Sequence, residues 1–120
     1  MNQFEKIIKD YSYINFINDD KWVEDGLDLL SDKEYKKAAK KFKELIASQP
    51  FHHTGYIGLS FVYYEINEKE KAVLFMKKAL ELARNFLKDN SISMIFIEEI
   101  EVYLQCMINN ETIYPWERLC

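Results

Sequence analysis

The amino-acid sequence predicts an all-α protein, an antiparallel helix-hairpin array of about six helices. Three observations predict this fold class. The 120 residues include only three glycines and two prolines, whereas β sandwiches and barrels need many turn residues. Apolar residues recur at helical spacing along most of the chain. The pattern of small and apolar residues also repeats after 34 residues.

The composition fits one folded domain, residues 1–120, because domains usually contain roughly 100–200 residues and 48% of this chain is apolar. The chain has a net charge of −4, whereas nucleic-acid-binding proteins usually have an excess of basic residues. The longest apolar run, 94–97, is far shorter than the roughly 18 residues of a membrane span. Charged residues interrupt the N-terminal apolar positions, which argues against a secretory signal. We therefore expect a soluble, cytoplasmic protein that binds neither nucleic acid nor membrane.

The first predicted element is an N-terminal packing helix, residues 1–18. Its apolar stripe contains Phe4, Ile7, Ile8, Tyr11 and Ile14. Asn2 and Glu5 have the spacing of a helix N-cap pair. Shifted by 34 residues, Phe4, Ile8 and Tyr11 fall on the apolar positions Ala38, Phe42 and Leu45. We therefore expect it to pack as a lone helix before the first repeat.

Two helix-turn-helix units follow, repeat 1 at 19–52 and repeat 2 at 53–86. Their first helices carry matching stripes: Trp22, Gly26, Leu29 and Leu30 in repeat 1, and Tyr56, Leu59, Ser60 and Tyr63 in repeat 2. Polar turns are expected at 31–33 and 65–69, and Pro50 ends the second helix of repeat 1. Gly26 disfavours a helix by about 1 kcal/mol relative to Ala. We therefore expect Gly26 and Ser60 to admit a neighbouring helix backbone.

The spacing Trp22-x-x-x-Gly26-x-x-Leu29, followed by Ala38-x-x-x-Phe42 and Pro50, resembles the tetratricopeptide repeat (TPR) signature. Repeat 2 keeps Leu59, Tyr63, Ala72 and Ala79 in the same frame. It departs from the signature with Tyr56 for Trp, Ser60 for Gly and Met76 for Phe, and it lacks the terminal proline. The resemblance covers residues 19–86. It implies an α-solenoid in which the first helix of each repeat lines a concave groove.

Residues 91–109 are predicted to form the last helix, with a stripe of Ile92, Ile95, Phe96, Ile100, Tyr103 and Met107. This segment resembles the capping helix that such arrays need for solubility. Residues 110–120 form a tail, and its apolar part, 113–116, is expected to be extended around Pro115.

The resemblance implies six groove-lining side chains, all apolar or aromatic: Val23, Leu27, Leu30, Ile57, Phe61 and Tyr64. Large exposed apolar patches mark interaction surfaces, so we expect an apolar peptide or helix of another protein to bind there. Some family members clamp a chaperone's C-terminal carboxylate with Lys and Asn. Val23, Leu27 and Phe61 occupy those positions here, which disfavours that partner.

Two alternatives to an open groove remain. In the first, the chain's own N-terminal helix or its 113–116 segment fills the groove. In the second, another copy of the chain covers the groove in a homodimer. Ile97, Val102 and Leu104 lie off the main stripe of the last helix and would supply a second dimer contact.

The remaining patterns have simple structural interpretations. The lysines at 33, 36, 37, 40, 41 and 43 suit a solvated convex face, with an acidic partner or a phosphate as the alternative. His52 and His53 lack zinc-site spacing and are interpreted as a polar loop pair. Cys106 is expected to be a buried thiol. Cys106 and Cys120 are the two cysteines of the sequence, and two are too few for a disulfide scaffold.

No pattern indicates catalysis. The acidic groups at 19–25 and 98–101 suit solvated helix faces, and neither a Ser–His–acid arrangement nor a glycine-rich phosphate loop occurs. We therefore expect no enzyme activity, no cofactor and no metal. The expected function is that of a protein-binding adaptor, scaffold or chaperone-like cofactor.

Overall fold

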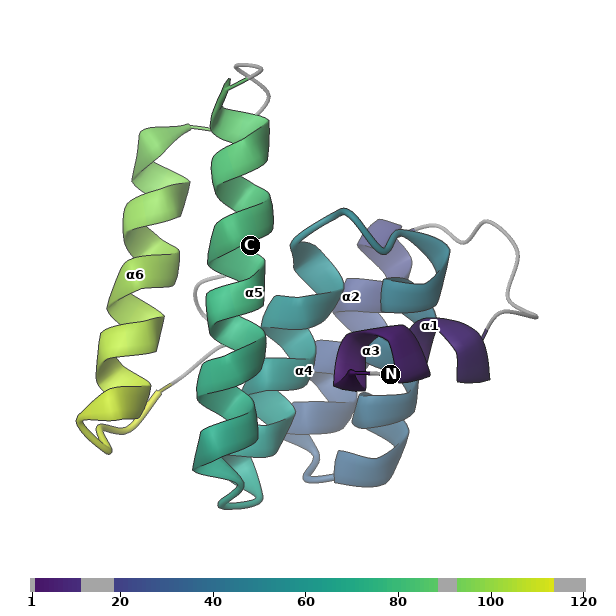
Figure 1. Cartoon of the computed structure of the whole chain (residues 1–120). Helices are drawn as coiled ribbons and strands as arrows, with labels where there is room; N and C mark the ends of the chain where they lie inside the picture. Colours follow the sequence, from purple (N-terminus) through teal and green to yellow (C-terminus); the bar gives the residue numbers. More distant parts are fainter. Residues whose placement is uncertain (1, 12–18, 89–92, 114–120) are drawn as a thin grey trace.

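The computed structural model describes residues 2–11, 19–88 and 93–113. Within these ranges the chain forms six α-helices and no β-strand (Figure 1). The helices are α1 (Gln3–Asp10), α2 (Asp19–Ser31), α3 (Tyr35–Ser48), α4 (Thr54–Glu65), α5 (Lys69–Lys88) and α6 (Met94–Ile108). The predicted all-α fold class is confirmed.

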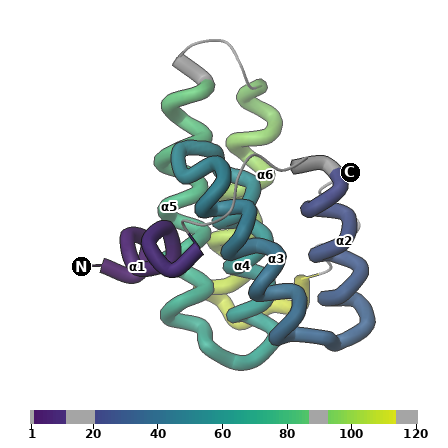
Figure 2. The backbone as a smooth tube through the Cα atoms, turned by 90° about the vertical axis from the view of Figure 1, so that its right-hand side faces the viewer, coloured from purple at the N-terminus to yellow at the C-terminus, as the bar shows by residue number. Residues whose placement is uncertain are grey.

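Helices α2 to α6 pack in chain order, each against the next. Consecutive helices run in opposite directions, so α2 with α3 and α4 with α5 form two hairpins, and α6 lies along α5 (Figure 1). Helix α1 lies across α3 instead of parallel to it (Figure 1). Figure 2 shows α1 and α2 on opposite sides of α3 and α4. The array therefore exposes two different sides, one bearing α1 and one bearing α2.

The two hairpins turn with the same backbone geometry. Lys33 after α2 and Asn67 after α4 adopt left-handed φ angles of 62° and 64°. Each donates its N–H to the carbonyl three residues earlier, at 3.0 and 3.2 Å. The next residue, Glu34 or Glu68, donates to the carbonyl five residues earlier at 2.8 Å. This pair of bonds is the Schellman motif, and it recurs at the 34-residue spacing found in the sequence.

The core around α3 is built on Phe42, which is fully buried. A Cβ atom at Gly26 of α2 would lie 2.6 Å from Phe42 Cζ, and one at Gly58 of α4 would overlap the same ring. We expected a neighbouring backbone at Gly26, and the structure places an aromatic side chain there instead. The backbone of α3 does approach α4 closely at Gly55, where a Cβ would lie 3.0 Å from the backbone nitrogen of Ile46.

Ser60 links α4 to α5. Its Oγ donates to the Ala72 carbonyl of α5 at 2.5 Å and lies 3.4 Å from Met107 Sδ of α6. Because Ser60 is fully buried, these contacts satisfy its hydroxyl away from water. The approach of the α5 backbone agrees with the expectation for a small residue at this position.

Helix α1 is shorter than the expected 1–18 helix. It spans Gln3–Asp10, and 12–18 lie outside the described residues. The expected cap is present, because Asn2 Oδ1 accepts a hydrogen bond from the Glu5 N–H at 2.8 Å.

The placement of α1 also differs from the expected stacking before repeat 1. Phe4 contacts Tyr56 of α4 and Phe75 of α5 edge-on, with ring centroids 5.8 and 5.0 Å apart. These aromatic contacts give the apolar stripe of α1 a packing surface across α3, α4 and α5. Neither ring contact lies on α2, the first helix of repeat 1.

Helix α6 buries Ile100, Tyr103 and Met107 of the expected stripe, together with Ile97, which was not part of it. Ile95 is 69% exposed instead, and Ile92 lies outside the described residues. Ser93 Oγ caps the helix by accepting from the Phe96 N–H at 3.3 Å, so the helix begins at Met94 and not at 91. Ile97 is therefore a core residue, which removes it from the expected dimer contact.

Candidate protein-interaction site

The six residues expected to line a groove lie on α2 and α4, the first helices of the two hairpins. Four are buried, with exposed fractions of 8%, 3%, 0% and 1% for Leu27, Leu30, Ile57 and Phe61. Val23 and Tyr64 are half-buried. Most of the set therefore belongs to the core, and only Val23 and Tyr64 are partly accessible.

Helix α6 and the segment after it cover part of the α4 face. Phe61 packs edge-to-face against Tyr103 of α6, with ring centroids 4.9 Å apart. Tyr64 Oη donates to the Glu111 carbonyl at 2.5 Å and lies 3.4 Å from the Cys106 carbonyl. Ile113 is buried in the same core. The part of the expected tail that the structure describes, up to Ile113, therefore packs back onto the domain.

The protonation state of Tyr64 suits this arrangement. Partial burial, followed by the nearby Cys106 thiol and the carboxylates of Glu111 and Glu65, raises the pKa of Tyr64 above its ordinary value. The phenol therefore stays protonated and acts as a donor to a backbone carbonyl.

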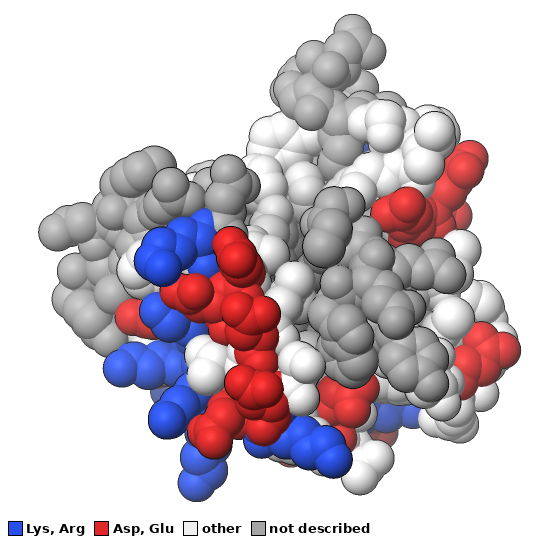
Figure 3. All heavy atoms as spheres, turned by 180° about the vertical axis from the view of Figure 1, so that it is seen from behind, with Lys and Arg blue, Asp and Glu red and all other residues white. Residues whose placement is uncertain are grey.

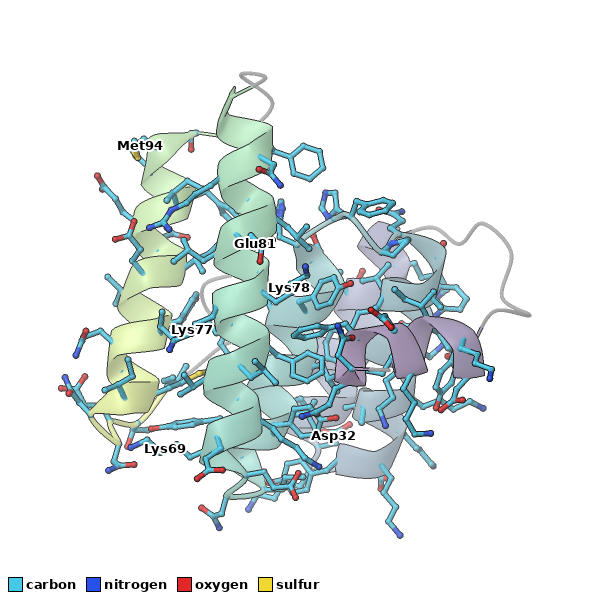
Figure 4. The ribbon with its side chains drawn as sticks, viewed as in Figure 1. Asp32, Lys69, Lys77, Lys78, Glu81 and Met94 are labelled. Carbon is cyan, nitrogen blue, oxygen red and sulfur yellow. The ribbon has the colours of Figure 1, made fainter. Side chains whose placement is uncertain are left out.

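A polar cavity of about 450 Å³ adjoins Tyr64 and is bordered by Asn67, Lys69, Thr112 and Ile113. Lys69 Nζ donates to the Ile108 carbonyl at 2.8 Å, which closes the last turn of α6 (Figure 4). The cavity gives solvent access to the place where the segment after α6 meets α4.

The lysines of α3 and of the turn before it, at 33, 36, 37, 40, 41 and 43, form two groups. Lys37 Nζ lies 3.7 Å from Glu34 Oε2, and Lys41 Nζ lies 4.0 Å from Asp25 Oδ2. Lys41 also stands 4.2 Å above the ring of Trp22. Seen from behind, a column of acidic side chains runs along α2 beside basic ones (Figure 3). The second group, at 33, 36, 40 and 43, borders two cavities on the α1 side of α3.

His52 and His53 do not form the polar loop pair that we expected. His53 is buried, stacks on His52 at 4.2 Å and contacts Phe96 of α6 at 4.9 Å. Its Nδ1 is buried and has no hydrogen-bond partner among the described residues. Burial, and then the nearby His52, lower the pKa of His53 to about 4. His53 is therefore a neutral ring in an aromatic cluster that also includes Phe86.

The cysteines and the acidic groups singled out in the sequence have these surroundings. Cys106 is half-buried on α6, and Cys120 lies outside the described residues. Glu101 pairs with Arg84 at 3.9 Å. Within 2–11, 19–88 and 93–113, no three His, Cys, Asp or Glu side chains gather in a way that could hold a metal ion. None of the helices in those ranges has the length and apolar character needed to cross a membrane.

Comparisons with models of protein families, with curated proteins and with solved structures give no match to this chain.

Proposed function

We propose that this chain is a non-catalytic protein-interaction module of the TPR kind, an adaptor or scaffold that binds an apolar segment of another protein along α2 and α4. The observation that carries the proposal is the contact between α4 and the segment after α6. There, Tyr64 donates to a backbone carbonyl, at Glu111, and the side chain of Ile113 is buried. A hydrogen bond to the main chain and a buried aliphatic side chain are the contacts by which apolar grooves bind peptides.

In this proposal the six predicted residues have two roles. Leu27, Leu30, Ile57 and Phe61 are the packed floor that shapes the surface, because they are buried. Val23 and Tyr64 contact the partner, because they are the half-buried members of the set. The chain's own segment up to Ile113 competes with the partner near Tyr64. A cytoplasmic location suits the proposal, since two cysteines form no disulfide scaffold.

A peptide-display screen tests the proposal. Immobilised wild-type protein is panned against a library of random peptides, and enriched peptides are then measured by fluorescence anisotropy. We expect enriched peptides to carry aliphatic residues and to lose binding to a Val23→Lys variant, in which a charge replaces the apolar contact. Leu74→Lys is the matched control, because Leu74 is 39% exposed on α5.

Two further results decide the groove assignment. Ile113→Ser should strengthen binding of the same peptides, because it loosens the competing segment. Absence of enriched peptides, or equal loss of binding in Val23→Lys and Leu74→Lys, would overturn the proposal. Phe61→Glu is unsuitable as a variant because it buries a carboxylate in the core, which would unfold the protein.

A second candidate function is that of a homo-oligomer subunit, and the outer face of α6 favours it. Met94, Ile95 and Val102 are 53%, 69% and 48% exposed there. Exposed apolar side chains on the last helix of an array suit a contact with a second copy. Light scattering across protein concentrations tests this candidate. We expect a dimer that dissociates in an Ile95→Glu variant, and a monomer at all concentrations would dismiss it.

A further inference from the structure

A second surface lies on the α1 side of α3, away from α2. Two cavities of about 600 and 580 Å³ open there, and Lys43 and Tyr63 border both. The first lies between α1, α3, α4 and α5, and the second lies between the start of α3 and the end of α4. Six lysines border the combined hollow, which we call the lysine cleft: Lys6, Lys33, Lys36, Lys40, Lys43 and Lys71.

The lysine cleft has a positive charge in an acidic protein. Its six lysines face two carboxylates, Asp10 and Glu34, which leaves four positive charges, whereas the whole chain has a net charge of −4. Both carboxylates are already paired, Asp10 with Lys6 at 2.9 Å and Glu34 with Lys37 at 3.7 Å. In the described part of the chain, no ion pair reaches the lysines at 33, 36, 40 and 43.

The floor of the lysine cleft is largely apolar. Val62 is buried and Ile66 is 39% exposed at the end of α4, while Tyr35 and Ala39 of α3 are half-buried beside them. Ile7 of α1 adds a buried aliphatic side chain at the other end. A simple solvated face would be polar throughout, whereas this surface combines a cationic rim with an aliphatic and aromatic floor.

We propose that the lysine cleft binds an acidic amphipathic segment of a partner protein. Its Asp and Glu side chains pair with the lysine rim, and its aliphatic side chains lie on the floor at Ile66 and Ala39. Charge complementarity favours this occupant. Lys6 and Lys71 already pair with Asp10 and Glu68, whereas the lysines at 33, 36, 40 and 43 make no ion pair within the described residues, and the chain as a whole is negative. The inference rests on the proposed role as a protein-interaction module, but it uses a different face from the α2–α4 groove.

A nucleic acid fits the lysine cleft less well. Base stacking requires an open aromatic face. Tyr63, which borders both cavities, already packs against Phe75 at 5.2 Å and lies 5.4 Å below Lys71 Nζ. The acidic column along α2 (Figure 3) also repels a polyanion that extends beyond the cleft.

Fluorescence anisotropy with designed probes tests the proposal on the full chain. The first probe is a short labelled peptide of Leu, Glu and Ala with leucines at helical spacing. The second replaces each Glu with Lys, and the third replaces each Leu with Ser. A labelled single-stranded oligonucleotide is the fourth. We expect saturable binding of the first probe alone, weakening as salt is raised.

The charge-reversal variant Lys43→Glu locates the site, because Lys43 borders both cavities. We expect it to weaken binding of the first probe by about tenfold. Lys77→Glu is the matched control. It reverses the same charge, but Lys77 lies on the side of α5 that faces α6, away from the lysine cleft (Figure 4). Lys77→Glu should bind within about twofold of wild type.

Several outcomes would overturn the inference. They are no binding of the Glu-Leu peptide, equal binding of the Ser-substituted peptide, tighter binding of the oligonucleotide, and equal loss in Lys43→Glu and Lys77→Glu. Val23→Lys separates this inference from the groove proposal, because it alters the other side of the molecule and should leave Glu-Leu peptide binding unchanged. Failure at the lysine cleft therefore leaves the groove proposal to its own test.

Discussion

The ring of Phe42 fills the space that a side chain at Gly58 would occupy, and the same ring lies 2.6 Å from where a Cβ at Gly26 would stand. Phe42 belongs to α3, and the two glycines belong to its neighbours α4 and α2. One aromatic ring therefore sets the distance between three helices, and it requires the absence of a side chain on both sides.

Gly58→Ala should lower the free energy of unfolding by about 2 kcal/mol. Alanine favours a helix over glycine by about 1 kcal/mol, but the added methyl overlaps a ring that is fully buried and cannot swing into solvent. Urea denaturation followed by circular dichroism measures the change.

Phe42→Leu is the control for that overlap. In the double variant the smaller side chain makes room for the methyl, so its total cost should be less than the sum of the two single costs. Strictly additive costs would show that Phe42 is not the group that opposes a side chain at position 58.

His53 should make the protein less stable as the pH falls. Its pKa is about 4 in the folded protein and 6.5 as a free side chain, so the unfolded chain takes up a proton first and is stabilised. This contribution is absent above pH 6.5, grows as the pH falls, and reaches at most about 3 kcal/mol near pH 4. Urea denaturation at several pH values measures it.

His53→Phe isolates the effect, because phenylalanine keeps an aromatic ring beside Phe96 and Phe86 but does not titrate. The variant should lose less stability than wild type between pH 7 and pH 4. Equal losses would mean that His53 is not the group responsible, since the carboxylates are common to both proteins.

Tyr64→Phe should loosen the segment after α6 without unfolding the domain. It removes the hydroxyl that donates to the Glu111 carbonyl at 2.5 Å, which costs about 1 kcal/mol. Hydrogen exchange should become faster at the amide of Ile113. Tyr63→Phe is the matched control, because the Tyr63 hydroxyl makes no hydrogen bond to the described residues. A similar increase in both variants would contradict the assignment.

Phe4→Ala should detach α1 and cost about 2 kcal/mol, since it removes two ring contacts, with Tyr56 and Phe75. Binding of the Glu-Leu peptide should also weaken, because α1 contributes Lys6 and Ile7 to the lysine cleft. Phe51→Ala is the control. Phe51 is 80% exposed, so its loss should change stability by less than about 0.5 kcal/mol. Equal stability of the two variants would show that α1 does not depend on Phe4.

The local features of the fold could be predicted from sequence. Helical spacing of apolar residues, the cap at Asn2 and the turns near Lys33 and Asn67 depend on a few neighbouring residues, and each appears where expected. The stripe of α6 was predicted in part: Ile100, Tyr103 and Met107 are buried as expected. Ile95 faces solvent and Ile97 faces the core, because the packing of α6 on its neighbours decides which of several adjacent apolar residues are buried.

The candidate site was harder to predict because it depends on contacts between distant segments. Phe61 looked groove-facing within its own repeat, but Tyr103 of α6 covers it. One of the two cavities of the lysine cleft exists because α1 crosses α3, and nothing in the sequence around Lys6 or Lys40 indicates that crossing. The aromatic environment of His53 likewise joins α4 to Phe86 of α5 and Phe96 of α6, which no local pattern reveals.

The matched turns at Lys33 and Asn67 have a consequence for protein engineering. A segment cut after Glu34 and after Glu68 begins and ends in the same backbone state, with the same pair of hydrogen bonds at each boundary. A duplicate of residues 35–68 inserted at either boundary would therefore retain both turns and add one more helix pair. In such modular chains each added unit contributes its own stability and one new interface, so the melting temperature of lengthened versions should rise with the number of inserted copies.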